Sequence, residues 1–450
     1  MSQVGETVVE IASNDFIIEK VHQVELSKDD NNDLVTDNEI PVWLTKDLIK
    51  DALCKHLKDN AIVVKDLKVY HLGGKGESFA SKMYRVSTYY YSENAENIQF
   101  ISCILKTLPQ SNMALEKLGV NHYNVQNKEM IFYERIIPKL EEILKTIEED
   151  EKTFPTVMAV YYELDLIVLG DLTEKNFLLA NRLKGLDMNH IKMTLRCLAR
   201  MHAASVILHE RDEKIFEIYD CGFYTTKTDA FNDMFLTCLE SFTDEVASWK
   251  EWEDYEYYHQ KLKTMQKYVI KNGRNAFNFD RNDFNALNHG DLWTTNIMFQ
   301  YNSCGFPIQA LLIDFQYSFY GSAVLDLHYL LYSSLPDKLR LENLEELIQF
   351  YYYEIKSFLE RLDYDMTKFL SLHSFQIQVQ KRSFYAFSAC MLSFPVHTTE
   401  KDEDANFESL MGRDNRSMAF KRRIYQNSRF KQIAMDFLPI FDRRGILDLN

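Results

Sequence analysis

The fold of this chain is decided by two short stretches, HGDLWTTN at residues 289–296 and IDFQ at residues 313–316. Asp291 and Asn296 stand five positions apart in the first stretch, and Asp314 follows an apolar run in the second. A carboxylate at the end of a buried strand is costly unless it meets a cation or hydrogen-bond donors. Asn and Asp oxygens are hard ligands suited to Mg²⁺. The two stretches together therefore indicate a site that holds a metal ion.

The spacing H-x-D-x-x-x-x-N is typical of a catalytic loop that transfers a phosphoryl group. We predict that Asp291 is the catalytic residue, which accepts the proton of a substrate hydroxyl or orients that hydroxyl. Asn296 and Asp314 are the predicted ligands of Mg²⁺, and His289 is expected to hold the loop rather than act as the base. The alternatives are that Asp291 caps a helix or turn, and that Asp314 is a buried Asp satisfied by backbone donors.

Composition limits the classes of function. The 450 residues include 46% hydrophobic and 26% charged residues, and 51 Lys and Arg against 67 Asp and Glu give a net charge of −16. Nucleic-acid and anionic-membrane binding need a basic surface, so we expect neither partner. The seven cysteines are scattered without a C-x-x-C pair, which argues against a disulfide framework and a zinc site. Without a visible signal peptide or long apolar run, a cytoplasmic protein is expected.

The pattern of hydrophobic residues predicts two lobes. Strand-like runs and one main helix occupy the first third, and helical periodicity dominates afterwards except at residues 285–315. The expected fold is α+β, with a nucleotide cleft between the lobes. The expected strands cover 61–64, 83–91, 98–106 and two runs within 157–168, and the expected helix covers 124–147 with Pro138 dividing it. The predicted divisions are a flexible acidic segment at 1–40, a β-rich N-lobe at 41–168, a hinge at 169–173 and an α-rich C-lobe at 174–450.

With these motifs the sequence resembles the ecdysteroid kinase-like family, also called CHK kinase-like, within the choline kinase and aminoglycoside phosphotransferase group. The catalytic stretches match the family's H-G-D-x-W-x-x-N and D-F-Q signatures, and the resemblance covers about residues 40–440. It extends to GKGESFAS at 74–81, the strand lysine Lys106, the E-x-x-F-Y-x-x-x-x-P helix from Glu129 to Pro138, LARMHAAS at 198–205, and Asp326-Leu327.

The resemblance implies a protein kinase-like bilobal fold with ATP as the phosphoryl donor. Lys106 would bind the α and β phosphates and pair with Glu129. Gly74 and Gly76 would let the backbone of a turn approach the phosphates, because glycine has no side chain. Taken alone, the two glycines also fit an ordinary hairpin turn, Lys106 a solvent-facing strand end, and Glu129 an exposed helix residue.

The resemblance also assigns the adenine contacts to the hinge, at Asp171 and Leu172. Adenine is usually held there by backbone atoms, so Gly170, at a position where relatives commonly have Glu, should not abolish binding. His202, in the helix that carries LARMHAAS, is expected to support the catalytic loop.

The substrate is left open by the residues themselves. The best-known activity of the family is phosphorylation of ecdysteroid hormones at a hydroxyl. Many aromatic residues lie in 205–285, and they form either a helix core or an apolar wall for a bulky ligand such as a steroid. The first hypothesis is a kinase of an ecdysteroid or similar apolar alcohol. The others are a kinase of a cationic small molecule, choline- or aminoglycoside-like, and a non-catalytic protein that binds nucleotide or ligand.

Overall fold

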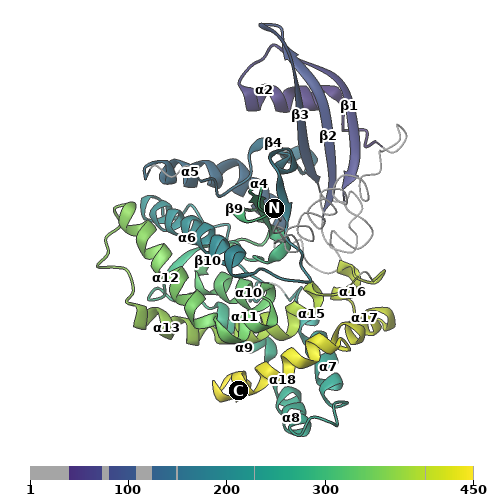
Figure 1. Ribbon diagram of the computed structural model, residues 1–450, viewed down its shortest axis with the longest axis vertical. Helices are drawn as coiled ribbons and strands as arrows, with labels where there is room; N and C mark the ends of the chain where they lie inside the picture. Colours follow the sequence, from purple (N-terminus) through teal and green to yellow (C-terminus); the bar gives the residue numbers. More distant parts are fainter. Residues whose placement is uncertain are drawn as a thin grey trace, which may run out of the picture.

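The structure is a computed structural model of the chain. A small lobe built around a sheet lies above a larger lobe of helices (Figure 1). The described residues are 40–72, 81–107, 124–147, 151–227, 229–400 and 402–448. The acidic segment predicted at 1–40 lies outside these ranges except for Ile40.

The small lobe contains a five-stranded antiparallel sheet with the strand order β1-β2-β3-β5-β4. Successive side chains of a strand point to opposite faces, and in β2 the residues Tyr84, Val86 and Tyr90 are all buried on one face. Aromatic and β-branched residues suit such a half-buried surface. The strands are β1 (Ile62–Leu72), β2 (Lys82–Ser92), β3 (Ala95–Thr107), β4 (Val157–Tyr161) and β5 (Leu166–Gly170).

One face of this sheet is covered by helix α2 (Lys46–Leu57). Thr45 caps the helix by accepting a hydrogen bond from the Leu48 amide at 3.2 Å. Ile49 and Leu53 stand four positions apart on one side of the helix and are buried in a core shared with β1 to β5. The helix is therefore held to the sheet by an apolar stripe at helical spacing.

The second helical segment of the small lobe contains a wide π-helical turn. It consists of α4 (Val125–Ile131), a π-helical turn (Phe132–Ile136) and α5 (Ile137–Lys145). Pro138 stands in the first turn of α5, where its missing N–H needs no partner. The backbone stays helical through Pro138, so the expected division is absent, and the irregularity lies just before it as a π turn, a feature frequent at functional sites.

Short strands below the small lobe frame the two sequence motifs. A 3₁₀ turn (Leu172–Lys175) follows β5, and β6 (Phe177–Leu179) then pairs with β8 (Ile297–Tyr301), which pairs with β9 (Pro307–Leu312). A separate pair joins β7 (Asn285–Asn288) to β10 (Phe319–Ser322). The stretch 289–296 thus lies between β7 and β8, and Asp314 lies between β9 and β10.

The large lobe is organised around helix α6 (Met188–Arg211), which begins at the capping residue Asp187. Nearly every residue from Ile191 to Leu208 is buried, as expected for a helix in the middle of a core. The other helices are α7 (Asn232–Val246), α8 (Tyr255–Met265), α9 (Val269–Phe277), α10 (Val324–Ser334), α11 (Asp337–Glu342), α12 (Leu344–Arg361), α13 (Leu372–Lys381), α14 (Ser383–Ser388), a π turn (Ala389–Ser393), α15 (Phe394–His397), α16 (Phe407–Met411), α17 (Asn415–Tyr425) and α18 (Ser428–Arg443).

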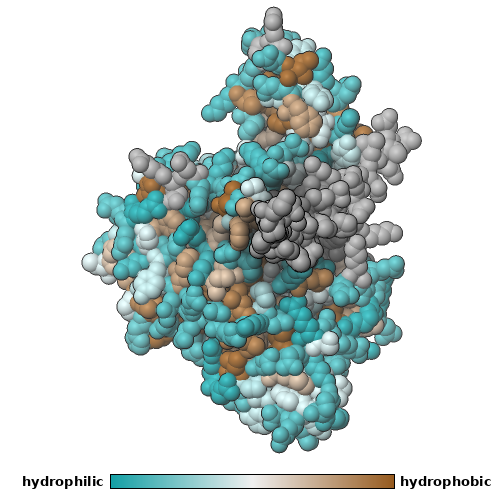
Figure 2. Space-filling model, viewed as in Figure 1, coloured by the Kyte–Doolittle hydropathy of each residue, from teal (hydrophilic) through white to brown (hydrophobic). Residues whose placement is uncertain are grey.

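The predicted α+β architecture of two lobes is confirmed, with differences at element ends. Strand β1 continues to Leu72, and β5 continues to Gly170, inside the range predicted as hinge. Strands β6 and β10 were not predicted, because three or four residues are too few to show an alternating pattern. Hydrophilic residues dominate the face shown in Figure 2, with apolar residues in small groups between them. Within the described ranges, no helix is both long and apolar enough to cross a membrane.

Candidate active site

A buried lysine of the small lobe's sheet is bonded to helix α4. Lys106, near the end of β3, is 5% exposed, and its Nζ lies 2.7 Å from Glu129 Oε1 and 2.9 Å from Asp314 Oδ1. Burial would lower the pKa of Lys106, but the charges of Asp314 and Glu129 outweigh burial and raise it. Burial raises the pKa of Glu129, and the Lys106 charge opposes this shift. The ammonium therefore stays charged between two carboxylates that come from different elements.

Asp314 is held in an unusual backbone conformation. Its φ of +70° lies in the left-handed region, which residues other than glycine seldom adopt. Its backbone N–H donates to the Tyr133 hydroxyl at 3.2 Å. The next residue, Phe315, is fully buried and stacks on Phe132 with the ring centroids 4.1 Å apart. The helix from Glu129 to Tyr133 therefore fixes both Lys106 and the segment that carries Asp314.

The loop 289–296 depends on one glycine. Gly290 has a φ of +85°, and a Cβ placed there would lie 2.0 Å from the Tyr317 carbonyl oxygen. The buried His289 ring donates from Nε2 to the Ile313 carbonyl oxygen at 2.9 Å, because a carbonyl oxygen can only accept. His289 thus links the loop to the end of β9, which agrees with the holding role expected for it.

A buried carboxylate from helix α10 anchors this loop. Asp326 accepts hydrogen bonds from the backbone N–H groups of His289 at 2.6 Å and Gly290 at 2.8 Å. His202 Nε2 lies 3.2 Å from the same carboxylate, and Tyr351 Oη lies 2.6 Å from His202 Nδ1. The expectation that His202 supports the loop is met through Asp326. Sequence reasoning did not assign this role to Asp326, although a carboxylate within the apolar helix VLDLHYLL is a signal in itself.

Asp291 and Asn296 lie against each other. Asn296 Nδ2 donates to the Asp291 carbonyl oxygen at 2.7 Å and to Asp291 Oδ2 at 3.2 Å. Burial, and then the charge of Asp314, raises the pKa of Asp291 to about 8. Hydrogen bonds from Tyr329 and Asn296 act in the opposite direction and favour the carboxylate. The structure therefore brings Asp291, Asn296 and Asp314 to one place.

The negative charge around Asp291 and Asp314 would favour a bound cation. Asp314 raises the pKa of both Asp291 and Glu129 by repulsion, and Lys106 is the cation bound to this group. Because the amide nitrogen of Asn296 donates to Asp291, its Oδ1 is the atom of this side chain that could act as a metal ligand. Within the described ranges, no group of three or more His, Cys, Asp or Glu could hold a metal. A site of one carboxylate and one amide oxygen suits Mg²⁺, which is usually bound by few protein ligands together with phosphates.

One of the two predicted nucleotide contacts in the hinge, Asp171, has a structural role for its side chain. Asp171 is buried and accepts hydrogen bonds from Arg85 Nε and Ser102 Oγ, both at 2.7 Å, and from the Thr173 amide at 3.0 Å. The Asp171 carboxylate therefore ties β2 and β3 to the hinge, which leaves backbone atoms for any contact to a base. Leu172 follows at the start of the 3₁₀ turn. Gly74 and Gly76 lie outside the described residues.

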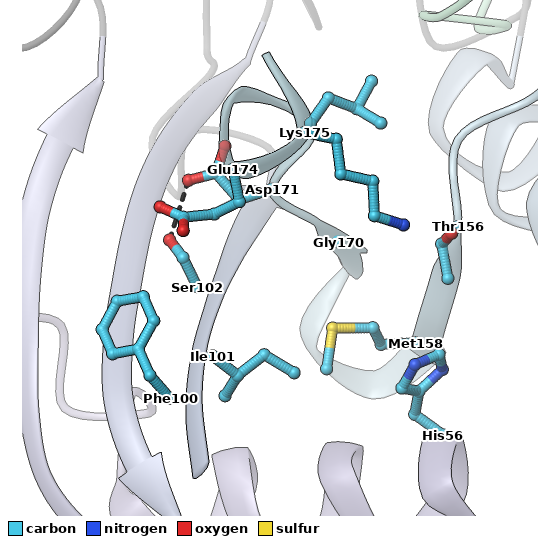
Figure 3. Close-up of a pocket in the computed structure, with 11 residues that line it drawn as sticks. His56, Phe100, Ile101, Ser102, Thr156, Met158, Gly170, Asp171, Glu174 and Lys175 are labelled. Atoms are coloured by element: carbon cyan, nitrogen blue, oxygen red, sulfur yellow. Dashed lines mark hydrogen bonds between the residues drawn. The ribbon is translucent and has the colours of Figure 1, made fainter. Parts of the chain in front are cut away.

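A pocket of about 190 Å³ lies beside the hinge (Figure 3). Its lining comes from α2, β3, β4 and the hinge, and includes His56, Met158 and Lys175. Neither Lys106 nor Asp291 lines it. The pocket is therefore separate from the place where the predicted catalytic and metal-binding residues meet.

An aromatic cluster stands next to Asp291. Phe223 lies 4.9 Å from Tyr317 and 6.0 Å from Tyr329 between ring centroids, and Phe231 lies 5.8 Å from Tyr317. The charge of Asp291 acts on both Tyr317 and Tyr329. Most of the aromatic residues of 205–285 are buried in the core, as the first interpretation of that segment predicted. Phe223 is the half-buried member of this cluster, and Phe223, Phe231, Tyr317 and Tyr329 are called the aromatic cluster below.

Comparison with known families gives a match to the model of the ecdysteroid kinase-like family over residues 75–364. The matched range contains Lys106, Glu129, the loop 289–296 and Asp314. The chain belongs to the ecdysteroid kinase-like family. The family match agrees with the resemblance seen in the sequence motifs, and the α+β architecture of two lobes is the one that this resemblance implied.

Three solved structures with a similar course of the chain are the following. A choline kinase from Cryptosporidium parvum is 11% identical, with 90% of this chain and 98% of that chain covered and a TM-score of 0.40. A putative aminoglycoside phosphotransferase from Ralstonia eutropha is 11% identical, with coverages of 84% and 98% and a TM-score of 0.36. An ethanolamine kinase from Plasmodium vivax is 10% identical, with coverages of 95% and 99% and a TM-score of 0.33. No curated protein matches the chain.

Proposed function

We propose that this family member transfers a phosphoryl group from ATP, with Mg²⁺, to a hydroxyl of an apolar small molecule such as an ecdysteroid. The observation that carries the proposal is the position of Lys106 between Glu129 and Asp314. Asp291 lies close enough to Asp314 that the Asp314 charge raises its pKa. Positioning and charge stabilisation make up most of the catalysis of phosphoryl transfer. Family membership supports the same class of reaction.

Each residue of the site has one task in this proposal. Lys106 binds phosphate oxygens, and Glu129 keeps its ammonium in place. Asn296 and Asp314 hold the metal ion, which when bound neutralises charge on the phosphates. Asp291 orients the acceptor hydroxyl and accepts its proton. Asp326 fixes the backbone of the loop through the amides of His289 and Gly290.

The surroundings of Asp291 favour an apolar acceptor over a cationic one. Phe223, the half-buried member of the aromatic cluster, supplies apolar surface beside Tyr317 and Tyr329, and small-molecule pockets are lined mostly by such side chains. Aromatic faces also attract a quaternary ammonium ion, so a cationic substrate would be distinguished by carboxylates beside the rings that are available to pair with it. Several carboxylates of residues 220–233 and 402–404 have cationic partners within the protein: Asp220 with Lys227, Asp229 with Arg274, Asp233 with Arg413, and Asp402 and Asp404 with Arg423.

The test is ADP release from Mg²⁺·ATP across a panel of ecdysteroids, sterols, choline and aminoglycosides. We expect turnover with an apolar alcohol, and a loss of about 10²–10⁴-fold in kcat for Asp291→Ala. Binding of ATP to this variant should be largely kept, because Lys106 and Asp314 remain. Asp436→Ala, in helix α18, serves as a matched control and should leave turnover unchanged.

Three results would contradict the proposal. Unchanged turnover in Asp291→Ala would remove the role of Asp291. Turnover with choline or an aminoglycoside and with no apolar alcohol would replace the substrate class. Absence of ATP and Mg²⁺ binding in the full-length protein would favour a non-catalytic role.

A further inference from the structure

Tyr351 of helix α12 is a buried tyrosine that the proposed function leaves without a task. Its side chain is fully buried, and its Oη lies 2.6 Å from His202 Nδ1. Burial raises the pKa of Tyr351, so the hydroxyl keeps its proton. A buried O–H needs an acceptor, and His202 Nδ1 is the partner of this hydroxyl among the described residues. Tyr351 therefore donates its proton to His202 Nδ1.

This hydrogen bond determines which ring nitrogen of His202 carries a proton. A ring nitrogen that accepts a hydrogen bond has no proton of its own, so the single proton of the neutral ring lies on the other nitrogen. That nitrogen is Nε2, which lies 3.2 Å from Asp326 Oδ2. A ring protonated on both nitrogens would leave the Tyr351 proton buried without an acceptor, which is unfavourable. His202 is thus a neutral ring that accepts from Tyr351 and donates to Asp326.

The Asp326 carboxylate accepts three N–H groups in this arrangement. Two are the backbone amides of His289 and Gly290, at 2.6 and 2.8 Å, and the third is His202 Nε2. Asp326 is 1% exposed, so water does not readily replace a lost donor. If the His202 proton lay on Nδ1, the lone pair of Nε2 would face the carboxylate, and repulsion would replace the hydrogen bond. The tautomer of His202 therefore affects the carboxylate that holds the loop amides.

We propose that Tyr351 is a positioning residue, which acts on the catalytic loop by fixing the tautomer of His202. His202 then donates to Asp326, and Asp326 holds the amides of the two residues that precede Asp291. The hydrogen bonds run from α12 to α6, from α6 to α10 and from α10 to the loop. The inference rests on the proposed function for the role of Asp291 in turnover. The hydrogen bonds themselves exist whether or not the protein is a kinase, so they are tested separately.

The kinetic test uses Tyr351→Phe, which removes one oxygen and keeps the ring beside Phe375, with the ring centroids 6.0 Å apart. We expect kcat to fall about 10–100-fold, because small misplacements of a reacting group cost that much. The KM for ATP should stay within about twofold of the wild type, as for a change that acts on the transition state. Tyr352→Phe is the matched control, because it removes the same atom from the next residue of α12, whose hydroxyl donates to the Leu370 carbonyl oxygen at 2.8 Å. The control should keep kcat, and an equal fall in both variants would overturn the proposal.

A double variant separates control of the tautomer from packing. His202→Leu removes the ring and the donor to Asp326, so it should lower kcat at least as far as Tyr351→Phe. In this background Tyr351→Phe should change kcat by less than about twofold, because no ring remains for the hydroxyl to act on. If Tyr351→Phe lowers kcat by the same factor with and without His202, Tyr351 acts by packing and the proposal is wrong.

The tautomer is measured without any turnover by ¹⁵N NMR of protein labelled at histidine. His202→Gln, which keeps a polar side chain at the buried position, assigns the His202 signals by their disappearance. We expect a neutral ring with the proton on Nε2 in the wild type, and in Tyr351→Phe a gain of the forms protonated on Nδ1. A wild-type ring protonated on Nδ1, or His202 signals unchanged in Tyr351→Phe, would overturn the proposal. A wild type with the expected signals but without phosphoryl transfer would instead count against the proposed function.

Discussion

The charged side of the site and its aromatic side are held together by different forces. The charged side consists of Lys106, Glu129 and Asp314, which are joined by two direct ion pairs of 2.7 and 2.9 Å. The aromatic side is the cluster of Phe223, Phe231, Tyr317 and Tyr329, whose ring centroids lie 4.9–6.0 Å apart. Charge pairs fix single atoms, whereas packed rings fix a surface.

Because the two sides are held by different forces, they differ in how well they tolerate substitution. The reaction could therefore stay the same while the substrate changes. A buried ion pair tolerates little variation, because removing one partner leaves the other charge unpaired. Apolar packing tolerates exchanges of similar volume at small cost. Asp291 lies between the two sides, since the charge of Asp314 raises its pKa and its own charge raises the pKa of Tyr317 and Tyr329. We infer that the charged side determines the reaction, and the aromatic side the acceptor.

The largest effect is expected from Lys106→Met. The substitution leaves Glu129 and Asp314 without their cation, and breaking a buried pair costs about 3–5 kcal/mol. The midpoint of thermal unfolding should therefore fall, and binding of ATP should be lost. Adding Glu129→Gln removes the more deeply buried of the two unpaired charges, so the double variant should recover much of the stability and none of the binding. If the double variant is no more stable than Lys106→Met, the ion pair does not hold the charged side together.

A smaller effect is expected in the loop that separates the two sides. Gly290→Ala combines the strain of a φ of +85° with a contact of 2.0 Å to the Tyr317 carbonyl oxygen, and should cost about 2–5 kcal/mol and most of the activity. Gly445→Ala is the matched control, because its φ is +71° and a Cβ there would meet nothing within 4 Å. Thermal unfolding should show a loss of only about 1–2 kcal/mol for the control. Equal losses would mean that the contact with Tyr317 is relieved by movement of the loop.

The charged side could be predicted from sequence to a large extent, because its residues lie in short motifs with fixed spacing. Asp291, Asn296 and Asp314 were named from spacing and chemistry, and Lys106 with Glu129 from the family resemblance. The structure places all five together, and their roles stay predictions. Asp326 was named only as part of the resemblance and without a role, because a single carboxylate in an apolar helix indicates a buried polar group but not what that group binds.

The aromatic side could not be predicted in the same way. Phe223, Tyr317 and Tyr329 come from three segments, and each looks like one of many buried aromatic residues in its own segment. Tyr351 lies in α12, and nothing in its neighbourhood along the chain points to a site. Such contacts depend on how α6, α10 and α12 pack against one another and against the loop, and helical periodicity does not give that arrangement.

The smallest effect is expected from Phe223→Leu on the aromatic side. Phe223 is half-buried beside Tyr317 and Tyr329, so a smaller side chain removes apolar contact with an acceptor and leaves the ion pairs intact. Changes of this size in an apolar pocket are worth about 1 kcal/mol, or roughly fivefold in the KM for the acceptor. The KM for ATP should not change. Phe350→Leu, at another half-buried phenylalanine in α12, is the matched control and should alter neither constant. A rise in the KM for ATP in Phe223→Leu would show that the two sides are coupled, and that the acceptor surface cannot vary independently of the charges.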